Sequence, residues 1–311
     1  MRMDPSQLRG SPVLVTGAGG FLGSVVVRRL VSLGAEVRAL AGPAPAGLRP
    51  LPAGVEGVHG DIEDAELLRR LVDGVACVYH VAGPPSVAGS FAAPALYLRV
   101  HAAGTAALIE RCAAAGVRRF VHVSSAEVYG AASGLVGEDH PRAPRSPYGI
   151  AKLAAELLLE TSGLLASIVR PFSIYGPGAS PRSLLAGLLD QLDRGDALVV
   201  ADLRPVRDYC FVDDAAEAIV AASLRDGPPV RAYNVASGRG VSVAELARTL
   251  LRAAGREELP VRERGGDRPT GALTLELVGD PTRARQELGF ETRTALEDGL
   301  VRTLRAGRRR D

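Results

Sequence analysis

Residues 12–23 read PVLVTGAGGFLG, and this stretch decides the fold. Its first part, Pro12 to Thr16, is a short apolar and β-branched run that is typical of a buried strand. Glycines follow directly, and helical apolar spacing then runs from Phe21 to Leu33, with Gly34 placed to end the helix. A strand, a glycine-rich turn and a helix in this order predict a loop that presents backbone N–H groups at a helix N-terminus.

Each spaced glycine of this loop has a predicted task. Gly17 permits the tight turn, Gly20 lets the backbone approach a pyrophosphate closely, and Gly23 allows tight contact between helix and strand. Because the strand lies in front and the helix behind, a dinucleotide-binding loop is favoured over a merely tight turn. The predicted cofactor contacts in this loop are Gly17, Gly19, Gly20, Phe21, Leu22 and Gly23.

The alternation of strands and helices continues along the chain. Further strands are predicted at 36–41, 55–59, 75–82, 118–124 and 165–170, and helices at 61–72, 97–115 and 148–160. This pattern predicts an α/β fold with a doubly wound, Rossmann-like parallel sheet. We expect residues 11–175 to form the dinucleotide-binding domain, with parts of 205–240 returning to it. Residues 176–305 are expected to form a smaller C-terminal substrate-binding domain, and residues 1–10 and 306–311 flexible termini.

The composition excludes several classes of protein. The 311 residues include 37 Lys+Arg and 35 Asp+Glu, so the formal net charge of +2 gives no basic surface for nucleic acid. No apolar run is long enough to span a membrane, and the first ten residues lack the apolar core of a signal peptide. The three cysteines, Cys77, Cys112 and Cys210, show no metal-ligand spacing. We therefore expect buried reduced thiols, no metal site, no membrane partner and a cytoplasmic location.

The end of the second predicted strand leaves the choice between NAD and NADP open. Position 41 is Ala41, whereas an acidic residue there would bind the ribose 2′-hydroxyl of NAD. Arg38 or Arg49 could meet the 2′-phosphate of NADP, although a surface arginine is the simpler interpretation of each. Asp61, after the third strand, is placed to bond an adenine amino group, to cap the next helix, or both.

Lys152 is the only lysine among the basic residues, and every other one is arginine. It lies four residues after Tyr148, so the two side chains share one face of the predicted helix. A nearby ammonium favours the phenolate, which predicts a lowered pKa for Tyr148 and a general base. The alternative is an amphipathic helix with a snorkelling lysine, a role that arginine would fill equally well. Ser125 follows the fifth strand at the ligand-binding edge of such sheets, where its hydroxyl could bond a reacting oxygen.

As a set, these motifs resemble the extended short-chain dehydrogenase/reductase family, in its nucleotide-sugar epimerase/dehydratase branch. The resemblance runs in order along most of the chain. The matching motifs are Thr16-Gly-x-x-Gly-x-x-Gly23, Gly60-Asp61-Ile62, His80-Val-Ala-Gly83, Ser124-Ser-Ala-Glu-Val-Tyr-Gly130, Tyr148-x-x-x-Lys152, Arg170-Pro-Phe-Ser-Ile-Tyr-Gly-Pro-Gly178, Arg207-Asp-Tyr-Cys-Phe-Val-Asp-Asp214 and Tyr233-Asn-Val-Ala-Ser-Gly238.

The resemblance implies an NAD-dependent enzyme, with NADP left open, whose catalytic trio is Ser125, Tyr148 and Lys152. The implied substrate is a nucleotide sugar such as a UDP-, TDP- or GDP-hexose, and the implied assembly is a homodimer formed through helices 97–115 and 148–160. The implied substrate-binding residues are Ser125, Tyr148, Ser173, Arg207 and Arg264, although a surface ion pair explains Arg264 nearly as well. The further implied cofactor contacts are Asp61, Ile62, Val81, Ala82, Tyr148 and Lys152.

Residue 126 bears on which reaction the resemblance implies. A dehydratase of the family carries an Asp-Glu pair after the catalytic Ser or Thr, and this chain has Ala126 and Glu127. Ala126 cannot donate a proton, so a 4-epimerase that acts through a transient 4-keto sugar is favoured, with Glu127 as a further candidate catalytic residue or a structural carboxylate. A 4-ketoreductase, a decarboxylase or a dehydratase is the alternative, and the intact trio speaks against a non-catalytic sensor. His101 and Ser173 stand where the family usually has Asn.

Overall fold

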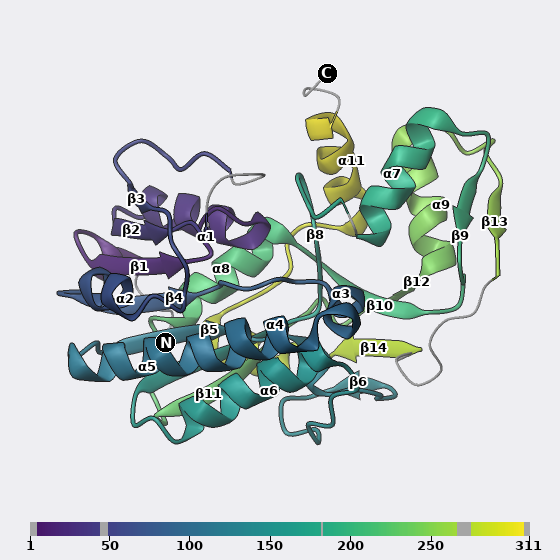
Figure 1. The fold of residues 1–311 in the computed structure, drawn as a ribbon. Coiled ribbons are helices and arrows are strands. Elements are labelled where there is room, and N and C mark those ends of the chain that lie inside the picture. The colour runs from purple at the N-terminus through teal and green to yellow at the C-terminus, as the bar shows by residue number, and fades with distance from the viewer. Residues whose placement is uncertain (1–4, 44–48, 182, 266–274, 308–311) are drawn as a thin grey trace.

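A seven-stranded parallel sheet forms the centre of the molecule, with strand order β11-β7-β5-β4-β1-β2-β3 (Figure 1). The computed structural model describes residues 5–43, 49–181, 183–265 and 275–307. The strands of the sheet are β1 (Pro12–Thr16), β2 (Glu36–Leu40), β3 (Glu56–Val58), β4 (Cys77–His80), β5 (Arg119–Val123), β7 (Leu165–Pro171) and β11 (Val230–Val235). The predicted α/β fold with a doubly wound, Rossmann-like sheet is confirmed.

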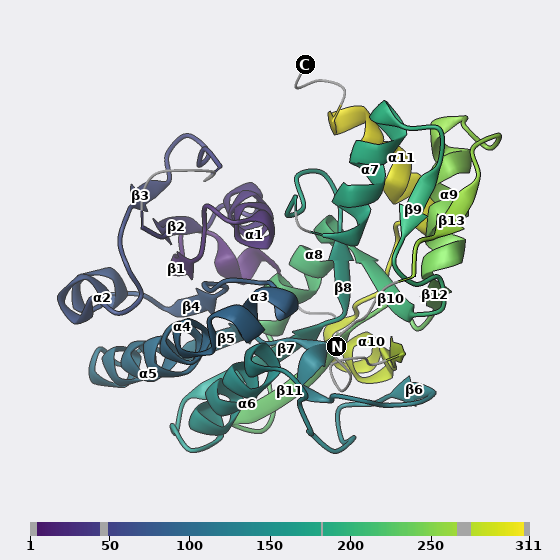
Figure 2. The same ribbon diagram turned by 45° about the vertical axis from the view of Figure 1, so that its right-hand side comes forward.

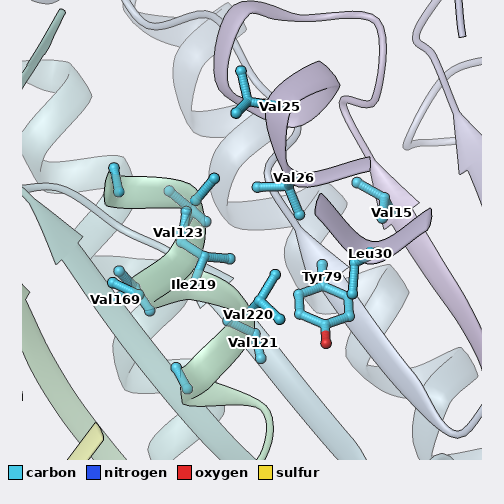
Figure 3. Close-up of a cluster of buried hydrophobic side chains, with 14 of the residues drawn as sticks. Val15, Val25, Val26, Leu30, Tyr79, Val121, Val123, Val169, Ile219 and Val220 are labelled. Atoms are coloured by element: carbon cyan, nitrogen blue, oxygen red, sulfur yellow. The ribbon is translucent and has the colours of Figure 1, made fainter. Parts of the chain in front are cut away.

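Helices cover both faces of this sheet. One face carries α1 (Phe21–Ser32), α8 (Val212–Ala222) and α10 (Thr282–Leu288), and the other carries α2 (Ala65–Val72), α5 (Gly104–Ala114) and α6 (Pro147–Glu160). Strand residues alternate between the two cores, since Val13 and Val15 pack with α1 and α8 while Leu14 packs on the other side. Figure 3 shows the first core, where Val26 of α1 lies beside the valines of the sheet and Ile219 of α8. Burial on both faces explains why these strands are continuous apolar runs.

The strand order reverses at β1, which lies between β2 and β4. In sheets of this kind, ligands bind at this switch point, beyond the carboxyl ends of the strands. The glycine loop follows β1, Val81 and Ala82 follow β4, and Ser125 follows β5. All of these segments therefore meet at one edge of the sheet.

The C-terminal part of the chain adds two smaller sheets. One has the order β12-β10-β14-β6 with β8 paired to β10, and in the other β13 pairs with β9. Together with α7 (Leu184–Arg194), α9 (Val243–Ala254) and α11 (Leu296–Gly307), several of these strands enclose a separate core beside the large sheet (Figure 2). Residues 205–240 are shared, because β10 lies in a small sheet whereas α8 and β11 belong to the large one. The strands of the smaller sheets are β6 (Leu135–Val136), β8 (Ser173–Tyr175), β9 (Leu198–Val200), β10 (Val206–Phe211), β12 (Gly240–Ser242), β13 (Val261–Glu263) and β14 (Glu276–Gly279).

Two predicted helices have different boundaries in the structure. The helix predicted from Asp61 begins at Ala65, because the Asp64 carboxylate caps it by accepting the backbone N–H groups of Glu66 and Leu67 at 3.1 and 3.0 Å. The segment predicted as one helix over 97–115 is divided. It runs as α4 (Pro94–Leu98), a single turn of π-helix called here the π-turn η2 (Arg99–Ala103), and then α5. The helix α3 (Val87–Ala92) precedes it.

The described parts of the termini pack against the fold, and the flexibility predicted for 1–10 and 306–311 stays a prediction. Residues Pro5–Leu8 form a short 3-10 helix, η1, and Leu8 is only 4% exposed because it packs into the core between the sheet and α1. At the other end, α11 extends to Gly307. The remaining terminal residues lie outside the described residues.

Two further predictions concern the cysteines and the membrane. Cys77, Cys112 and Cys210 are all buried free thiols, as predicted. Within the described ranges, no helix combines the length and the apolar character needed to cross a bilayer.

Candidate active site

The loop after β1 is shaped by glycines that a larger residue could not replace. Gly17 has φ of 69°, and a Cβ there would lie 2.7 Å from the backbone of Ala82. A Cβ on Gly23 would lie 2.1 Å from the carbonyl oxygen of Gly17. Gly20 caps α1 in an extended conformation without a side-chain hydrogen bond, so the first N–H groups of α1 face the loop. The result is a backbone-lined cradle that fits a dinucleotide pyrophosphate.

Thr16 fixes the segment that lies across from this cradle. Its backbone oxygen accepts the N–H of Val81 at 3.2 Å, and its hydroxyl oxygen accepts the N–H of Ala82 at 3.3 Å. Val81 and Ala82, both predicted cofactor contacts, are thereby held at the carboxyl end of β4.

Asp61 and Ile62 reach the same edge from β3. The Asp61 carboxylate accepts the N–H of Glu63 at 3.1 Å and does not cap α2, so the capping interpretation of Asp61 is wrong. Ile62 is buried against α5, where a Cβ on Gly104 would lie 2.7 Å from Ile62 Cγ2.

The two arginines considered for NADP already have protein partners. Arg38 donates to Glu56 at 3.2 Å and to backbone carbonyls at the end of α2. Arg49 is half-buried, its guanidinium lies 5.5 Å from the ring centroid of Phe21, and it donates to the carbonyl of Gly178. Arg49 thereby links the glycine-loop region to the turn after β8.

Tyr148 and Lys152 lie on the first turns of α6. The hydroxyl of Ser146 caps this helix by accepting the N–H of Gly149 at 3.1 Å, and Pro147 occupies its first position. The helical spacing leaves Lys152 Nζ 6.0 Å from the centroid of the Tyr148 ring. Both side chains are buried, with exposures of 8% for Tyr148 and 3% for Lys152.

Ser125 meets Tyr148 from the end of β5. The Ser125 hydroxyl lies close enough to the Tyr148 phenol to lower its pKa, and Ser125 Oγ accepts the backbone N–H of Glu127 at 3.2 Å. The structure thus brings Ser125, Tyr148 and Lys152 together from a strand and a helix that are separated in the sequence.

Burial controls the protonation of this cluster. It raises the pKa of the Tyr148 phenol to about 12, with the neighbouring Ser125 hydroxyl opposing the rise. It also lowers the pKa of the Lys152 ammonium to about 7, with Glu156 opposing the fall. The predicted lowering of the Tyr148 pKa by Lys152 is therefore wrong for the protein alone, because loss of solvation is the largest influence on the phenol.

A buried ion pair beneath the trio was missed by the sequence analysis. Glu156 is fully buried and accepts two hydrogen bonds from Arg170, at 2.9 and 2.7 Å, one from the Ser124 hydroxyl at 2.5 Å and one from Arg142 at 3.2 Å. Lys152 Nζ donates to the carbonyl of Val123 at 2.7 Å. The spacing of Glu156, four residues after Lys152, was the available signal. This network holds the end of β5 and the middle of α6 at a fixed separation.

Ser173 and Arg207 lie on neighbouring strands of the smaller sheet. Ser173 begins β8 and pairs with Tyr209 of β10, and Arg207 precedes that residue on the same strand. Burial raises the pKa of the Glu127 carboxyl, and the charge of Arg207 opposes that rise. The charge of Arg207, on the smaller sheet, therefore acts on the Glu127 carboxyl, which lies next to the trio in the sequence.

Arg264 lies apart from these residues. It follows β13, its side chain is exposed, and its backbone N–H donates to Val200 at 2.8 Å. In the described parts of the chain, no hydrogen bond or ion pair joins its side chain to the trio.

The glycine cradle at the switch point and the buried Ser-Tyr-Lys cluster beside it define a dinucleotide-dependent enzyme of the short-chain dehydrogenase type. The chain belongs to the NAD dependent epimerase/dehydratase family, which it matches over residues 13–236. The family resemblance, the enzyme class and NAD as the cofactor of the family are thereby confirmed.

Relatives of this chain catalyse more than one reaction. It is 33% identical to a UDP-glucose 4-epimerase of Azospirillum brasilense, over 96% of this chain and 92% of that one. It is 34% identical to a dTDP-glucose 4,6-dehydratase of Streptomyces griseus, over 94% of this chain and 92% of that one. The solved structure of MoeE5 in complex with UDP-glucose and NAD superposes with a TM-score of 0.87 at 31% identity, over 96% and 99% of the two chains. Sequence identity at this level therefore does not distinguish the two reactions, and the residues of the site must be compared instead.

Proposed function

We propose that this chain is an NAD-dependent nucleotide-sugar 4-epimerase that acts through a transient 4-keto sugar. The observation that carries the proposal is the Ser125, Tyr148 and Lys152 cluster beside the glycine cradle, with Ala126 where a dehydratase needs an acid. Both relatives named above act on nucleotide sugars, so a UDP-, TDP- or GDP-hexose is the proposed substrate.

Tyr148 acts as the general base in this mechanism. Its oxygen takes the proton of the sugar 4-hydroxyl, while Ser125 donates a hydrogen bond to the same sugar oxygen. When bound, NAD supplies reversible hydride transfer at C4, which converts the alcohol to a ketone and back. Because burial disfavours a lone phenolate and a lone ammonium alike, each charge in the pair stabilises the other, and Lys152 keeps its proton as Tyr148 loses one.

The cofactor contacts follow from the same edge of the sheet. The loop from Gly17 to Gly23 would hold the pyrophosphate, and Asp61 and Ile62 the adenine side. Val81, Ala82 and Lys152 would line the nicotinamide ribose. We assign the seven-stranded sheet to the cofactor and the smaller sheets to the substrate.

On the substrate side, Arg207 is the proposed partner of the diphosphate, because its planar fork of donors suits phosphate oxygens. Ser173 lies on the strand next to it. Arg264 is a second candidate for the diphosphate. Glu127 is proposed to face the sugar, between Tyr148 and Arg207.

A 4-ketoreductase is the second candidate function. Ala41 favours it, since that buried residue supplies no carboxylate to hold the ribose of a permanently bound NAD. A ketoreductase would exchange its cofactor in every turnover, whereas an epimerase can keep it.

The two candidates differ in cofactor consumption. Purified protein is freed of small molecules, its retained nucleotide is identified, and it is incubated with UDP-, TDP- and GDP-hexoses with and without NADH or NADPH. Interconversion of 4-epimers with no net cofactor consumption supports the epimerase. Stoichiometric oxidation of NADPH by a 4-keto sugar, with no epimer interconversion, contradicts it.

We also propose a homodimer through α4 and α6, which lie side by side in both views (Figures 1 and 2). Large apolar side chains are exposed on these helices and on α3, namely Phe91 at 46%, Leu96 at 39%, Ile150 at 49% and Leu157 at 46%. Sedimentation equilibrium should give twice the chain mass. The Ile150→Glu, Leu157→Glu double variant should sediment as a monomer, and an unchanged dimer would place the interface elsewhere.

A further inference from the structure

A series of buried, hydrogen-bonded polar groups lies at the carboxyl ends of β1 and β4 and does not include the catalytic trio. His80 lies between two threonines, with Nδ1 2.7 Å from the Thr16 hydroxyl and Nε2 2.9 Å from the Thr105 hydroxyl. The Thr105 hydroxyl is also 2.6 Å from the carbonyl oxygen of His101. His80 is 1% exposed and both threonines are fully buried, so solvent does not compete for these groups.

The direction of each hydrogen bond in this chain follows from what each group can donate. A carbonyl only accepts, so the Thr105 hydroxyl donates to His101 and its oxygen must accept from His80 Nε2–H. Burial lowers the pKa of His80 to about 3, so the ring is neutral and its Nδ1 is an acceptor. The Thr16 hydroxyl then donates to Nδ1, while its oxygen accepts the N–H of Ala82. We call this series of hydrogen bonds the relay. It runs from the N–H of Ala82 through Thr16, His80 and Thr105 to the carbonyl of His101, and each bond has one donor and one acceptor.

The relay ends at the π-turn η2 that separates α4 from α5. His101 lies within this turn, and π-turns in helices are frequent at functional sites. The His101 ring packs against the Tyr148 ring at a centroid distance of 5.4 Å and an interplanar angle of 75°. On its other side it covers Gly83, where a Cβ would lie 2.1 Å from His101 Cε1, and its Nε2 is 3.0 Å from the carbonyl of Pro84. The His101 ring therefore packs between the segment after β4, which we call the cofactor edge, and the phenol of Tyr148.

We propose that Thr105 and His80 are positioning residues of the active site. By holding the carbonyl of His101 in the π-turn, they keep the His101 ring against Tyr148 and so set the position of the phenol oxygen relative to Ser125. This inference rests on the proposed role of Tyr148 as the general base. The relay also connects the His101 segment to Thr16 and Ala82. The same hydrogen bonds therefore position both the residue that packs on Tyr148 and the proposed cofactor contacts.

The first test removes the central hydroxyl. Thr105→Val preserves shape but leaves His80 Nε2–H and the His101 carbonyl without their partner. We expect kcat for 4-epimer interconversion to fall on the order of tenfold to a hundredfold, because a small misplacement of a reacting group has an effect of that size. KM should be unchanged, and Thr105→Ser should restore kcat.

Thr303→Val is the matched control. Thr303 is also a buried helical threonine that donates to the carbonyl four residues earlier, at 2.7 Å, but it lies in α11 away from the site. It should lose stability with unchanged kcat. If Thr105→Val behaves like this control, with kcat intact, the positioning role is wrong. Tyr148→Phe, assayed alongside, separates the two proposals, because an active Tyr148→Phe refutes the base itself.

A second measurement does not depend on activity or on the fate of the valine variant. Nitrogen-15 spectra of the histidine rings in the wild-type protein should show His80 protonated on Nε2 only, from neutral pH down to about pH 5. A ring protonated on Nδ1, or one that gains a second proton in that range, would overturn the assigned direction of the relay.

Discussion

The proposed catalytic end of the large sheet and the proposed substrate side of the molecule differ in how deeply their functional groups are buried. At the catalytic end, Tyr148 and Lys152 are buried, and their neighbours Ser124 and Glu156 are fixed by hydrogen bonds within the fold. On the proposed substrate side, Arg207 is half-buried and donates to the carbonyl of Val206 at 2.9 Å, and Arg264 is exposed after β13 at the outer edge (Figure 2). The groups of the first region are closed off from solvent, whereas the side chains of the second region are open to solvent.

This difference also appears in the electrostatics. Burial shifts the pKa values of Tyr148 and Lys152 toward their neutral forms, to about 12 and about 7. Burial of the catalytic groups therefore comes with a loss of solvation, which the Ser125 hydroxyl opposes at Tyr148 and the Glu156 carboxylate opposes at Lys152. Changes at the catalytic end should alter kcat or stability, and changes on the substrate side should alter KM.

The largest expected effect is that of Tyr148→Phe. Removing the base should lower kcat about a hundredfold to ten-thousandfold while KM for the nucleotide sugar changes little. Tyr79→Phe is the matched control, since Tyr79 is a buried tyrosine whose hydroxyl donates to Ser223 at 2.7 Å in the opposite core. Steady-state epimerase assays on both variants test this, and equal losses of activity would argue against a catalytic role for the phenol.

Glu156→Gln tests whether the fold holds the catalytic end through its buried ion pair. Arg170 would lose its charged partner inside the protein, so the free energy of unfolding should fall by about 3–5 kcal/mol. In Glu287→Gln, the partner Arg231 is about one-third exposed, and the change should stay below about 1 kcal/mol. Denaturant unfolding of both variants provides the comparison, and similar losses would remove the distinction between the two environments.

The pH dependence of stability should report the buried lysine. The pKa of Lys152 falls from 10.5 to about 7 in the folded protein, so between these values the unfolded chain binds more protons than the native one. Relative to Lys152→Met, the wild-type protein without cofactor should therefore gain stability as pH rises from about 7 toward 10.5. Thermal unfolding over this range measures the difference, and a constant gap between the two proteins would show that Lys152 is not desolvated.

Arg207→Ala should act on substrate binding. Losing one charged donor to a diphosphate should raise KM on the order of tenfold, with kcat nearly unchanged. Isothermal titration with the free nucleoside diphosphate should show the same loss. A variant with normal KM and reduced kcat would show that Arg207 acts in catalysis and not in substrate binding.

The smallest effect is expected for Arg264→Ala. Its side chain is exposed, so stability should change by less than about 0.5 kcal/mol. If Arg264 also binds the diphosphate, KM should rise, and the double variant with Arg207→Ala should show whether the two arginines act on one group. An unchanged KM would leave Arg264 as a surface residue.

The only asparagine shows what local sequence could not reveal. The Asn234 side chain donates to the carbonyl of Val136 at 2.7 Å, and its carbonyl oxygen accepts from the Tyr129 hydroxyl at 2.6 Å. Its backbone N–H donates to Glu138 at 2.8 Å. A buried amide that both donates and accepts has no substitute of the same shape, which explains its presence in a chain that otherwise lacks asparagine.

The sequence predicted the strands and the glycine turn well because their signals are local. Apolar runs and the positive φ of Gly17 depend on neighbouring residues only. It failed at the break in the helix over 97–115, since a π-turn depends on contacts with Gly83 and Tyr148 that come from distant segments. It also gave no sign of the contact between Arg49 and Gly178, which lie far apart in the chain.

The amino-acid sequence by itself determined the glycine cradle, the alternation of strands and helices, and the shared helix face of Tyr148 and Lys152. These features need only steric rules and helical periodicity. The tertiary structure alone decided that Ser125 meets Tyr148, that Glu156 and Arg170 form one buried pair, and that His80 links two threonines. It also decided the sign of the Tyr148 pKa shift, because desolvation depends on everything that surrounds a group and not on its neighbours in the chain.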